Sequence, residues 1–158
     1  MLMHVHAADT PRRVPHLMPP QPCEPGALLN SLGPVEHEWH IVVLGNGGLS
    51  IMCALLRAGA PRVTHLRSHE RLEAQSASLV IVPRASSLEW LEAALPHIRR
   101  ALITNGCLAI FVDSSPTTKT RVERMLRRHG LSAVRTKRVA GRLLLTTEMP
   151  DFGLRQCA

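Results

Sequence analysis

Hydrophobic residues form short runs from residue 40 onward, and two different spacings alternate between the polar breaks. Apolar runs predict buried strands at residues 40–44, 79–82 and 107–112, and a further strand is predicted at residues 62–66, after the turn Gly59-Ala-Pro61. Apolar residues three and four positions apart predict amphipathic helices, at residues 49–58, 88–102 and 118–129. Asn105-Gly106 is expected to end the second of these helices. In the first of these helices we expect the core side to be formed by Met52, Leu55 and Leu56.

The end of the chain carries a different signal, two strand-like segments joined through a glycine. Residues 133–139 and 142–147 flank Ala140-Gly141 and predict an antiparallel hairpin. Strands that alternate with helices form parallel sheets covered on both faces, and the hairpin adds an antiparallel pair. The predicted fold class is therefore α/β, a three-layer fold with a mixed sheet that is mostly parallel.

Prolines set residues 1–36 apart from the rest of the chain. Seven prolines fall there, and each fixes φ and removes a backbone donor, so regular structure is disfavoured. We predict a proline-rich arm over residues 1–36, one folded domain over 37–150 and a short tail over 151–158. His4 and His6 in the arm lack a Cys or carboxylate partner at ligand spacing, so no metal site is predicted.

A glycine-rich turn follows the first predicted strand, in the segment His40-Ile-Val-Val-Leu-Gly-Asn-Gly-Gly-Leu-Ser50. Glycines let the backbone turn tightly and approach a ligand without an intervening Cβ, and the next helix presents free N–H groups. The spacing is one glycine short of the dinucleotide fingerprint, and a tight strand-to-helix turn is the alternative interpretation. We predict a nucleotide pocket lined by Gly45, Asn46, Gly47 and Gly48.

Charge is distributed unevenly along the chain. The net charge is +7; residues 1–39 carry −2, from two arginines against four carboxylates, which leaves +9 for residues 40–158. Arginines recur at helical spacing in the helix at 118–129 and predict a basic stripe, formed by Arg121, Arg124 and Arg128. The core side of this helix is expected to be formed by Val122, Met125 and Leu126. The stripe can bind an anionic partner, nucleic acid included, or be a solvated helix face. With 3% aromatic residues and no tyrosine, stacking on single strands is disfavoured.

Length and composition bound the class of protein. At 158 residues, with 45% hydrophobic residues, the chain suits one globular domain. No apolar run approaches the roughly 20 residues that cross a bilayer, and the start lacks the order of a secretory signal. We therefore expect a soluble, cytoplasmic protein. The four cysteines are widely spaced and are expected to be reduced thiols, with Cys53 and Cys107 buried.

Two segments carry a resemblance to a known family. In Leu91-Glu-Ala-Ala-Leu-Pro-His-Ile-Arg-Arg-Ala-Leu-Ile-Thr-Asn-Gly-Cys-Leu-Ala-Ile-Phe111, a helix runs through a Pro-Gly-Gly-like turn into a strand. Val122-Glu-Arg-Met-Leu-Arg-Arg-His-Gly-Leu131 then leads into the hairpin. In this order they resemble the fifth strand, last helix and terminal strand pair of class I S-adenosylmethionine-dependent methyltransferases. The resemblance covers about residues 38–150 and implies a Rossmann-like sheet with a cofactor pocket at the glycine turn.

Several positions depart from that family's cofactor motif. Val43 stands where the family has an acidic residue two places before its first glycine, and Leu49 where it has the third glycine. Arg67 aligns with the carboxylate that accepts hydrogen bonds from the cofactor ribose, whereas a guanidinium can only donate. Eleven residues separate Arg67 from Leu79, too few for the family's usual helix and third strand. The candidate cofactor-binding residues also include Arg67 itself and, beyond the glycine turn, Ser68, Pro83 and Arg84.

These departures determine the expected function. Losing charged hydrogen bonds of about 1.5–3 kcal/mol each at two places would weaken a micromolar site by several powers of ten. We predict a methyltransferase-like domain with a degenerate S-adenosylmethionine pocket and a non-catalytic interaction or scaffold role. The alternatives are an active S-adenosylmethionine-dependent methyltransferase with an atypical pocket, an NADP-binding Rossmann protein in which Arg67 and Ser68 meet a 2′-phosphate, and a basic nucleic-acid-binding module.

No catalytic residue is predicted. Asp113 is the one carboxylate that the pattern places at the carboxyl end of the later strands, where ligands bind in open α/β sheets. Its competing role is to cap the helix that follows.

Overall fold

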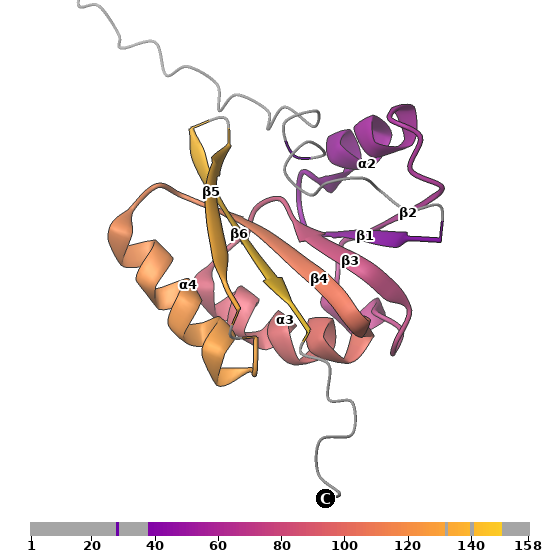
Figure 1. Cartoon of the computed structure of the whole chain (residues 1–158). Helices are drawn as coiled ribbons and strands as arrows, with labels where there is room; N and C mark the ends of the chain where they lie inside the picture. Colours follow the sequence, from indigo (N-terminus) through magenta and orange to yellow (C-terminus); the bar gives the residue numbers. More distant parts are fainter. Residues whose placement is uncertain (1–27, 29–37, 132, 140, 150–158) are drawn as a thin grey trace, which may run out of the picture.

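A six-stranded sheet forms the centre of the molecule (Figure 1). The computed structural model describes residue 28 and residues 38–131, 133–139 and 141–149. The strands are β1 (His40–Leu44), β2 (Arg62–Leu66), β3 (Ala77–Val82), β4 (Leu102–Val112), β5 (Arg135–Val139) and β6 (Arg142–Glu148), in the order β2-β1-β3-β4-β6-β5. β1 to β4 pair in parallel, and β6 pairs antiparallel with β4 and β5. The predicted mixed sheet is thus confirmed.

Helices cover both faces of this sheet (Figure 1). In the described part of the chain they are α2 (Gly48–Arg57), the 3-10 turn η1 (His69–Arg71), α3 (Leu88–Ala101) and α4 (Pro116–Arg128). α2 packs with Leu28 in one apolar cluster, and α3 packs with α4 in the other. Successive strand residues point into opposite clusters; Val42 faces the α3 side and Val43 the α2 side, both buried. Because both faces are covered, the buried strands read as unbroken apolar runs.

The boundary between α3 and β4 differs from the prediction. Asn105-Gly106 was expected to end the helix, but α3 ends at Ala101 and β4 begins at Leu102. Asn105 has φ 61°, and a Cβ on Gly106 would lie 2.8 Å from the carbonyl oxygen of Ile103. The pairing of β3 with β4 shifts register here. Asn105-Gly106 therefore forms an irregularity within β4. Asn and Gly favour this kind of backbone both inside an irregular strand and at the end of a helix, so the sequence does not distinguish the two.

Burial differs from the prediction at three other positions. Leu56 was expected to face the core but is 47% exposed, and Ile51 is buried in its place. Cys53 and Cys107 are half-buried, not fully buried. Leu56 therefore lies on the flank of α2 that faces solvent. The prediction that Val122, Met125 and Leu126 form the core side of α4 is confirmed.

Leu28 lies within the predicted proline-rich arm and is fully buried against the α2 side of the sheet. The other residues of that arm, with His4 and His6, and the predicted tail at 151–158 lie outside the described residues. No helix in the described ranges has both the length and the apolar character needed to span a membrane.

Candidate functional site at the carboxyl edge of the sheet

The residues predicted to hold a cofactor gather along one edge of the sheet. β1 pairs in parallel with both β2 and β3, so the segments that follow these three strands leave the same edge. The N–H of Gly45 donates to the carbonyl oxygen of Leu66 at 2.8 Å. A Cβ on Gly45 would lie 3.7 Å from the carbonyl oxygen of Arg84. The glycine turn, the end of β2 and the start of the loop after β3 therefore meet.

Gly45 begins the turn and is covered. Its φ of +97° is a conformation that side chains rarely adopt, which explains the glycine. The residue is buried. A Cβ on it would lie 3.4 Å from the outer ring of the Trp90 indole, which reaches the turn from the first turn of α3. The side of Gly45 on which a Cβ would lie is thus filled by protein.

Gly48 serves close packing between α2 and the sheet. A Cβ there would lie 2.6 Å from Cδ2 of His65 and 2.8 Å from Cγ1 of Val43. The Nε2 of His65 donates to the carbonyl oxygen of Gly45 at 3.0 Å, so β2 also holds the turn in place. Asn46 and Gly47 are the exposed members of the turn, and no atom lies within 4 Å of a Cβ placed on Gly47.

After β2, Arg67 points to solvent and Ser68 caps the 3-10 turn η1. Arg67 is exposed, and the hydroxyl of Ser68 accepts from the N–H of Glu70 at 3.3 Å, which caps η1. β2 forms one edge of the described sheet, and η1 occupies the segment that leads to β3. The prediction that too few residues remain for a further helix and strand before β3 is therefore confirmed.

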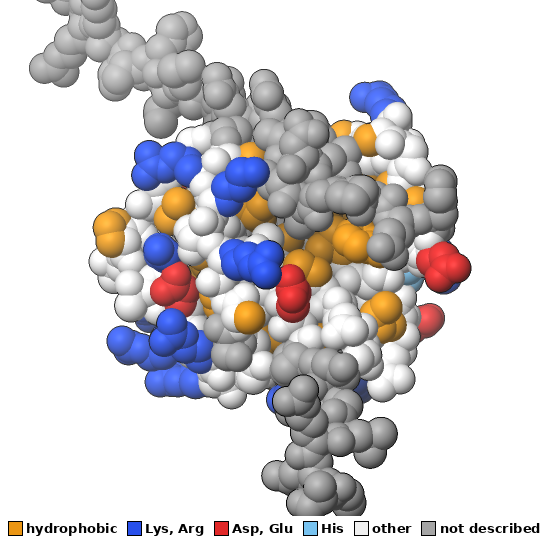
Figure 2. Space-filling view, viewed as in Figure 1, with side chains coloured by type: hydrophobic (Ala, Val, Ile, Leu, Met, Phe, Trp, Pro, Cys, Tyr) orange, Lys and Arg blue, Asp and Glu red, His pale blue; other side chains and the backbone are white. Residues whose placement is uncertain are grey.

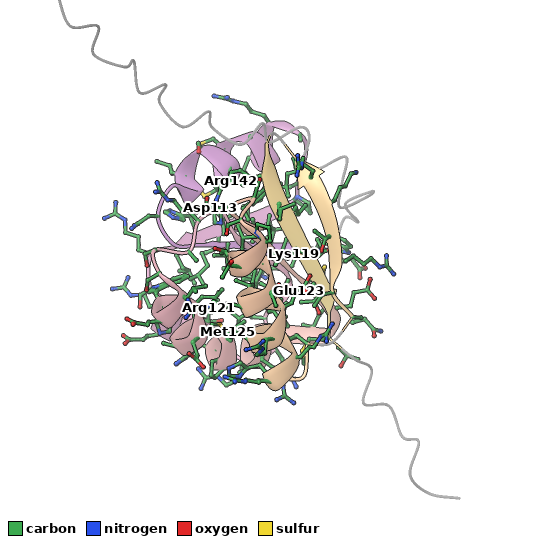
Figure 3. The ribbon with its side chains drawn as sticks, turned by 90° about the vertical axis from the view of Figure 1, so that its left-hand side faces the viewer. Asp113, Lys119, Arg121, Glu123, Met125 and Arg142 are labelled. Carbon is green, nitrogen blue, oxygen red and sulfur yellow. The ribbon has the colours of Figure 1, made fainter. Side chains whose placement is uncertain are left out.

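A cavity of about 280 Å³ opens farther along this edge. The loop after β3, the end of β4 and the first turns of α4 line it, with Arg84, Ser86, Asp113 and Thr118 as polar members. Arg142 closes one wall; its guanidinium donates to the carbonyl oxygens of Pro83 at 3.0 Å and Phe111 at 3.4 Å and lies 5.5 Å from the Phe111 ring centre. Figure 3 shows Asp113 and Arg142 at the same end of α4.

The cavity and the glycine turn share few residues. Of the predicted cofactor residues, Arg84 lines the cavity, whereas Pro83 contributes a carbonyl that Arg142 occupies. Asp113 is exposed at the rim, as expected for a residue after the fourth strand. The arrangement offers cations, hydroxyls, one carboxylate and an aromatic wall, which suit binding of a small polar ligand.

Three side chains at this edge were not singled out from the sequence as parts of a site. His65 and Trp90 hold the glycine turn, and Arg142 joins β3 to β4. The ring of Trp90 also contacts His69, which in turn contacts His97 with ring centres 4.9 Å apart. Among the residues that the structure describes, no three His, Cys, Asp or Glu side chains are grouped to hold a metal.

The fold alters the ionisation of the Cys107 thiol. Burial, and then the charge of Glu148, raise its pKa from 9.0 to about 11. Cys107 lies in β4 opposite Glu148 of β6, and its side chain faces the α2 side of the sheet. A protonated, half-buried thiol is a poor nucleophile, so it adds no reactive group to the candidate site.

Comparison with known proteins identifies the fold. No family model and no curated protein sequence matches this chain. Among solved structures, 1,6-didemethyltoxoflavin-N1-methyltransferase of Burkholderia thailandensis, with S-adenosylhomocysteine bound, matches at a TM-score of 0.56 and 15% identity, over 80% of this chain and 77% of that one. An O-methyltransferase family protein of the same organism matches at 0.60 and 13% identity, over 81% of this chain and 56% of that one.

A third match agrees with these two. It is a protein of Methanococcus maripaludis assigned to the S-adenosyl-L-methionine-dependent methyltransferases, with a TM-score of 0.60 and 14% identity, over 82% of this chain and 85% of that one. Identity this low establishes fold and not activity. The strand order, the antiparallel ending and these matches together show that the chain has a class I S-adenosylmethionine-dependent methyltransferase-like fold.

Proposed function

We propose that this chain is a methyltransferase-like domain whose S-adenosylmethionine pocket is degenerate, and that it has a non-catalytic interaction or scaffold role. The observation that carries the proposal is the burial of Gly45 beneath Trp90. A glycine that receives a cofactor must present an accessible backbone, because its purpose is close approach. Here the first glycine of the turn contacts an indole, and Gly48 contacts His65 and Val43.

A ligand that approached Gly45 would have to displace the Trp90 ring. Burial of a large apolar side chain contributes about 1.5–3 kcal/mol, and displacing this half-buried ring would forfeit part of it. Each 1.4 kcal/mol lost weakens binding about tenfold. The cost of displacing Trp90 therefore lowers the affinity for S-adenosylmethionine, whatever contacts the adenosine makes.

The charges at the turn oppose the cofactor as well. The position for the ribose-binding carboxylate holds Arg67, which is exposed and carries donors only. The position for the other acidic residue holds Val43, which is fully buried in the core. Two hydroxyls of a ribose would thus lack their carboxylate acceptor, and we expect S-adenosylmethionine to bind weakly or not at all. The residues of this turn do not fit the cofactor.

Calorimetric titration with S-adenosylhomocysteine tests the proposal. We expect no binding by the native protein at low micromolar concentration, and tighter binding by the double variant Trp90→Ala, Arg67→Asp. The matched control is Trp39→Ala, Arg62→Asp, which makes the same changes near the opposite ends of β1 and β2. A dissociation constant near 10 µM or tighter for the native protein, about 7 kcal/mol of binding, would overturn the proposal. Equal affinities of the two double variants would overturn the role given to Trp90 and Arg67.

The cavity beside the turn favours a second candidate, an active S-adenosylmethionine-dependent methyltransferase with an atypical pocket. It lies at the same edge as the turn and has room for a small substrate. The titration separates the two candidates, because the enzyme requires tight binding by the native protein. NADPH in a parallel titration tests the NADP alternative; we expect no binding, since the glycine turn is one glycine short of the dinucleotide fingerprint.

A further inference from the structure

A basic surface extends along one flank of α4 and onto the end of α3 that is remote from the candidate site. α3 ends directly before β4, and α4 runs back from the carboxyl end of β4 toward the start of β5, which is parallel to β4. Both helices therefore end at the amino edge of the sheet, opposite the glycine turn and the cavity. We define the arginine surface as Arg99, Arg121, Arg124 and Arg128; all four are exposed.

The two helices bring these arginines together. A Cβ on Gly130, two residues after α4, would lie 3.6 Å from Cζ of Arg99, so the end of α3 adjoins the end of α4. Arg121, Arg124 and Arg128 follow one another at helical spacing along one flank of α4. Figure 2 shows Lys and Arg side chains gathered on the side of the molecule where α4 and β5 lie.

Within the described residues, none of these four arginines forms an ion pair with a carboxylate. Glu123 is the carboxylate of α4, and it pairs with Lys119 at 3.6 Å. Figure 3 shows Lys119 and Glu123 on the flank nearer the hairpin strands and Arg121 on the other flank. A helix dipole favours cations in the last turn, which accounts for Arg99 and Arg128. It does not account for Arg121 and Arg124, which lie farther from the end of α4.

The composition of the surface narrows the class of partner. Membrane insertion requires an apolar helix face, but that face of α4, formed by Val122, Met125 and Leu126, is buried in the core. Protein interfaces centre on large apolar or aromatic side chains, yet the exposed large hydrophobic residues within the described ranges are Leu49, Leu56 and Ile103, none of them in α4. Unpaired bases need aromatic side chains for stacking, and α4 has none.

The remaining class is a regular polyanion. Arg121 and Arg128 are seven residues apart, about 10 Å along a helix. A duplex carries one negative charge per roughly 1.7 Å of its axis, so about six phosphates lie within that distance. A guanidinium group can donate two parallel hydrogen bonds to the oxygens of one phosphate, whereas a lysine ammonium acts as a point charge. We infer that the arginine surface binds the phosphate backbone of a nucleic-acid duplex without reading its sequence.

Fluorescence anisotropy with a labelled mixed-sequence duplex of about 20 base pairs, across salt concentrations of roughly 0.05–0.2 M, tests this inference. The test variant is Arg121→Gln, Arg124→Gln, Arg128→Gln. The control is Arg57→Gln, Arg62→Gln, Arg71→Gln, which removes the same charge from exposed arginines of α2, β2 and η1, outside α3 and α4. Circular dichroism establishes that both variants fold.

Native protein and control should bind the duplex with the same salt dependence. Each phosphate contact contributes about 0.9 to the slope of log affinity against log salt, so the test variant should lose about 2.7 of that slope. Equal loss in both variants would mean that net charge alone attracts the duplex, and it would overturn the inference. No binding by the native protein at roughly 0.15 M salt, or tighter binding to a single strand or to anionic vesicles, would overturn it as well. S-adenosylhomocysteine plays no part here, so this outcome is independent of the proposed function.

Discussion

Gly48→Ala separates a packing role of the glycine turn from a ligand-binding role. In most helices this change would stabilise the protein by about 1 kcal/mol, because alanine has the higher helix propensity. Gly48 is different, since the new methyl group would lie 2.6 Å from Cδ2 of His65 and 2.8 Å from Cγ1 of Val43. Val43 is fully buried and has no room to move. His65 can move, but its 3.0 Å hydrogen bond to the Gly45 carbonyl is then lost.

The expected net effect is a loss of stability. Overpacking costs about 1–3 kcal/mol and the lost hydrogen bond about 1 kcal/mol, against about 1 kcal/mol gained from helix propensity. The free energy of unfolding should therefore fall by about 1–3 kcal/mol. Urea denaturation followed by circular dichroism measures it; with a slope of about 2 kcal/mol/M, a loss of 2 kcal/mol lowers the midpoint by about 1 M.

A double-mutant cycle with His65→Ala identifies the cause. In the His65→Ala background the clash with the ring is absent and no hydrogen bond remains to be lost, so Gly48→Ala should cost at least about 1 kcal/mol less than in the native protein. The reasoning fails if Gly48→Ala is as stable as the native protein, or if its cost is the same in both backgrounds. A glycine kept for a ligand alone would give the first of these results.

Two further predictions concern the cap of α3 and the half-buried thiol. Ser87→Ala should lower the free energy of unfolding by about 1 kcal/mol, because the Ser87 hydroxyl accepts from the backbone N–H of Trp90 at 3.0 Å. In urea denaturation the control Ser86→Ala, at the exposed neighbouring position, should be about as stable as the native protein. Equal losses in the two variants would contradict the role of Ser87 as the cap of α3. The pKa of Cys107 rises from 9.0 to about 11 on folding, so the folded state binds the proton more tightly and stability should fall as the pH rises between these values. Cys107→Ala should remove this part of the dependence of stability on pH. If the free energy of unfolding of Cys107→Ala fell with pH as it does for the native protein, Cys107 would not be the cause.

Several elements could be predicted from the sequence because their cause is local. β1 and β2 begin and end at the predicted residues, since β1 is a short apolar run that ends at Gly45 and β2 follows directly on Pro61. The basic flank of α4 and its buried side follow from helical periodicity and were predicted correctly. Asn105-Gly106 was misassigned because those residues favour positive φ equally at a helix end and inside an irregular strand.

The glycine turn divides what the sequence determined from what the tertiary structure decided. Three glycines after an apolar run specify a tight strand-to-helix turn at residues 45–48, and the conformations of Gly45 and Gly47 bear this out. The side chains that contact the turn come from β2 and α3, as His65 and Trp90. Their approach depends on the parallel register of β1 with its neighbours and on the position where α3 begins. Local residue patterns do not encode such contacts, because they arise only when distant segments pack against one another.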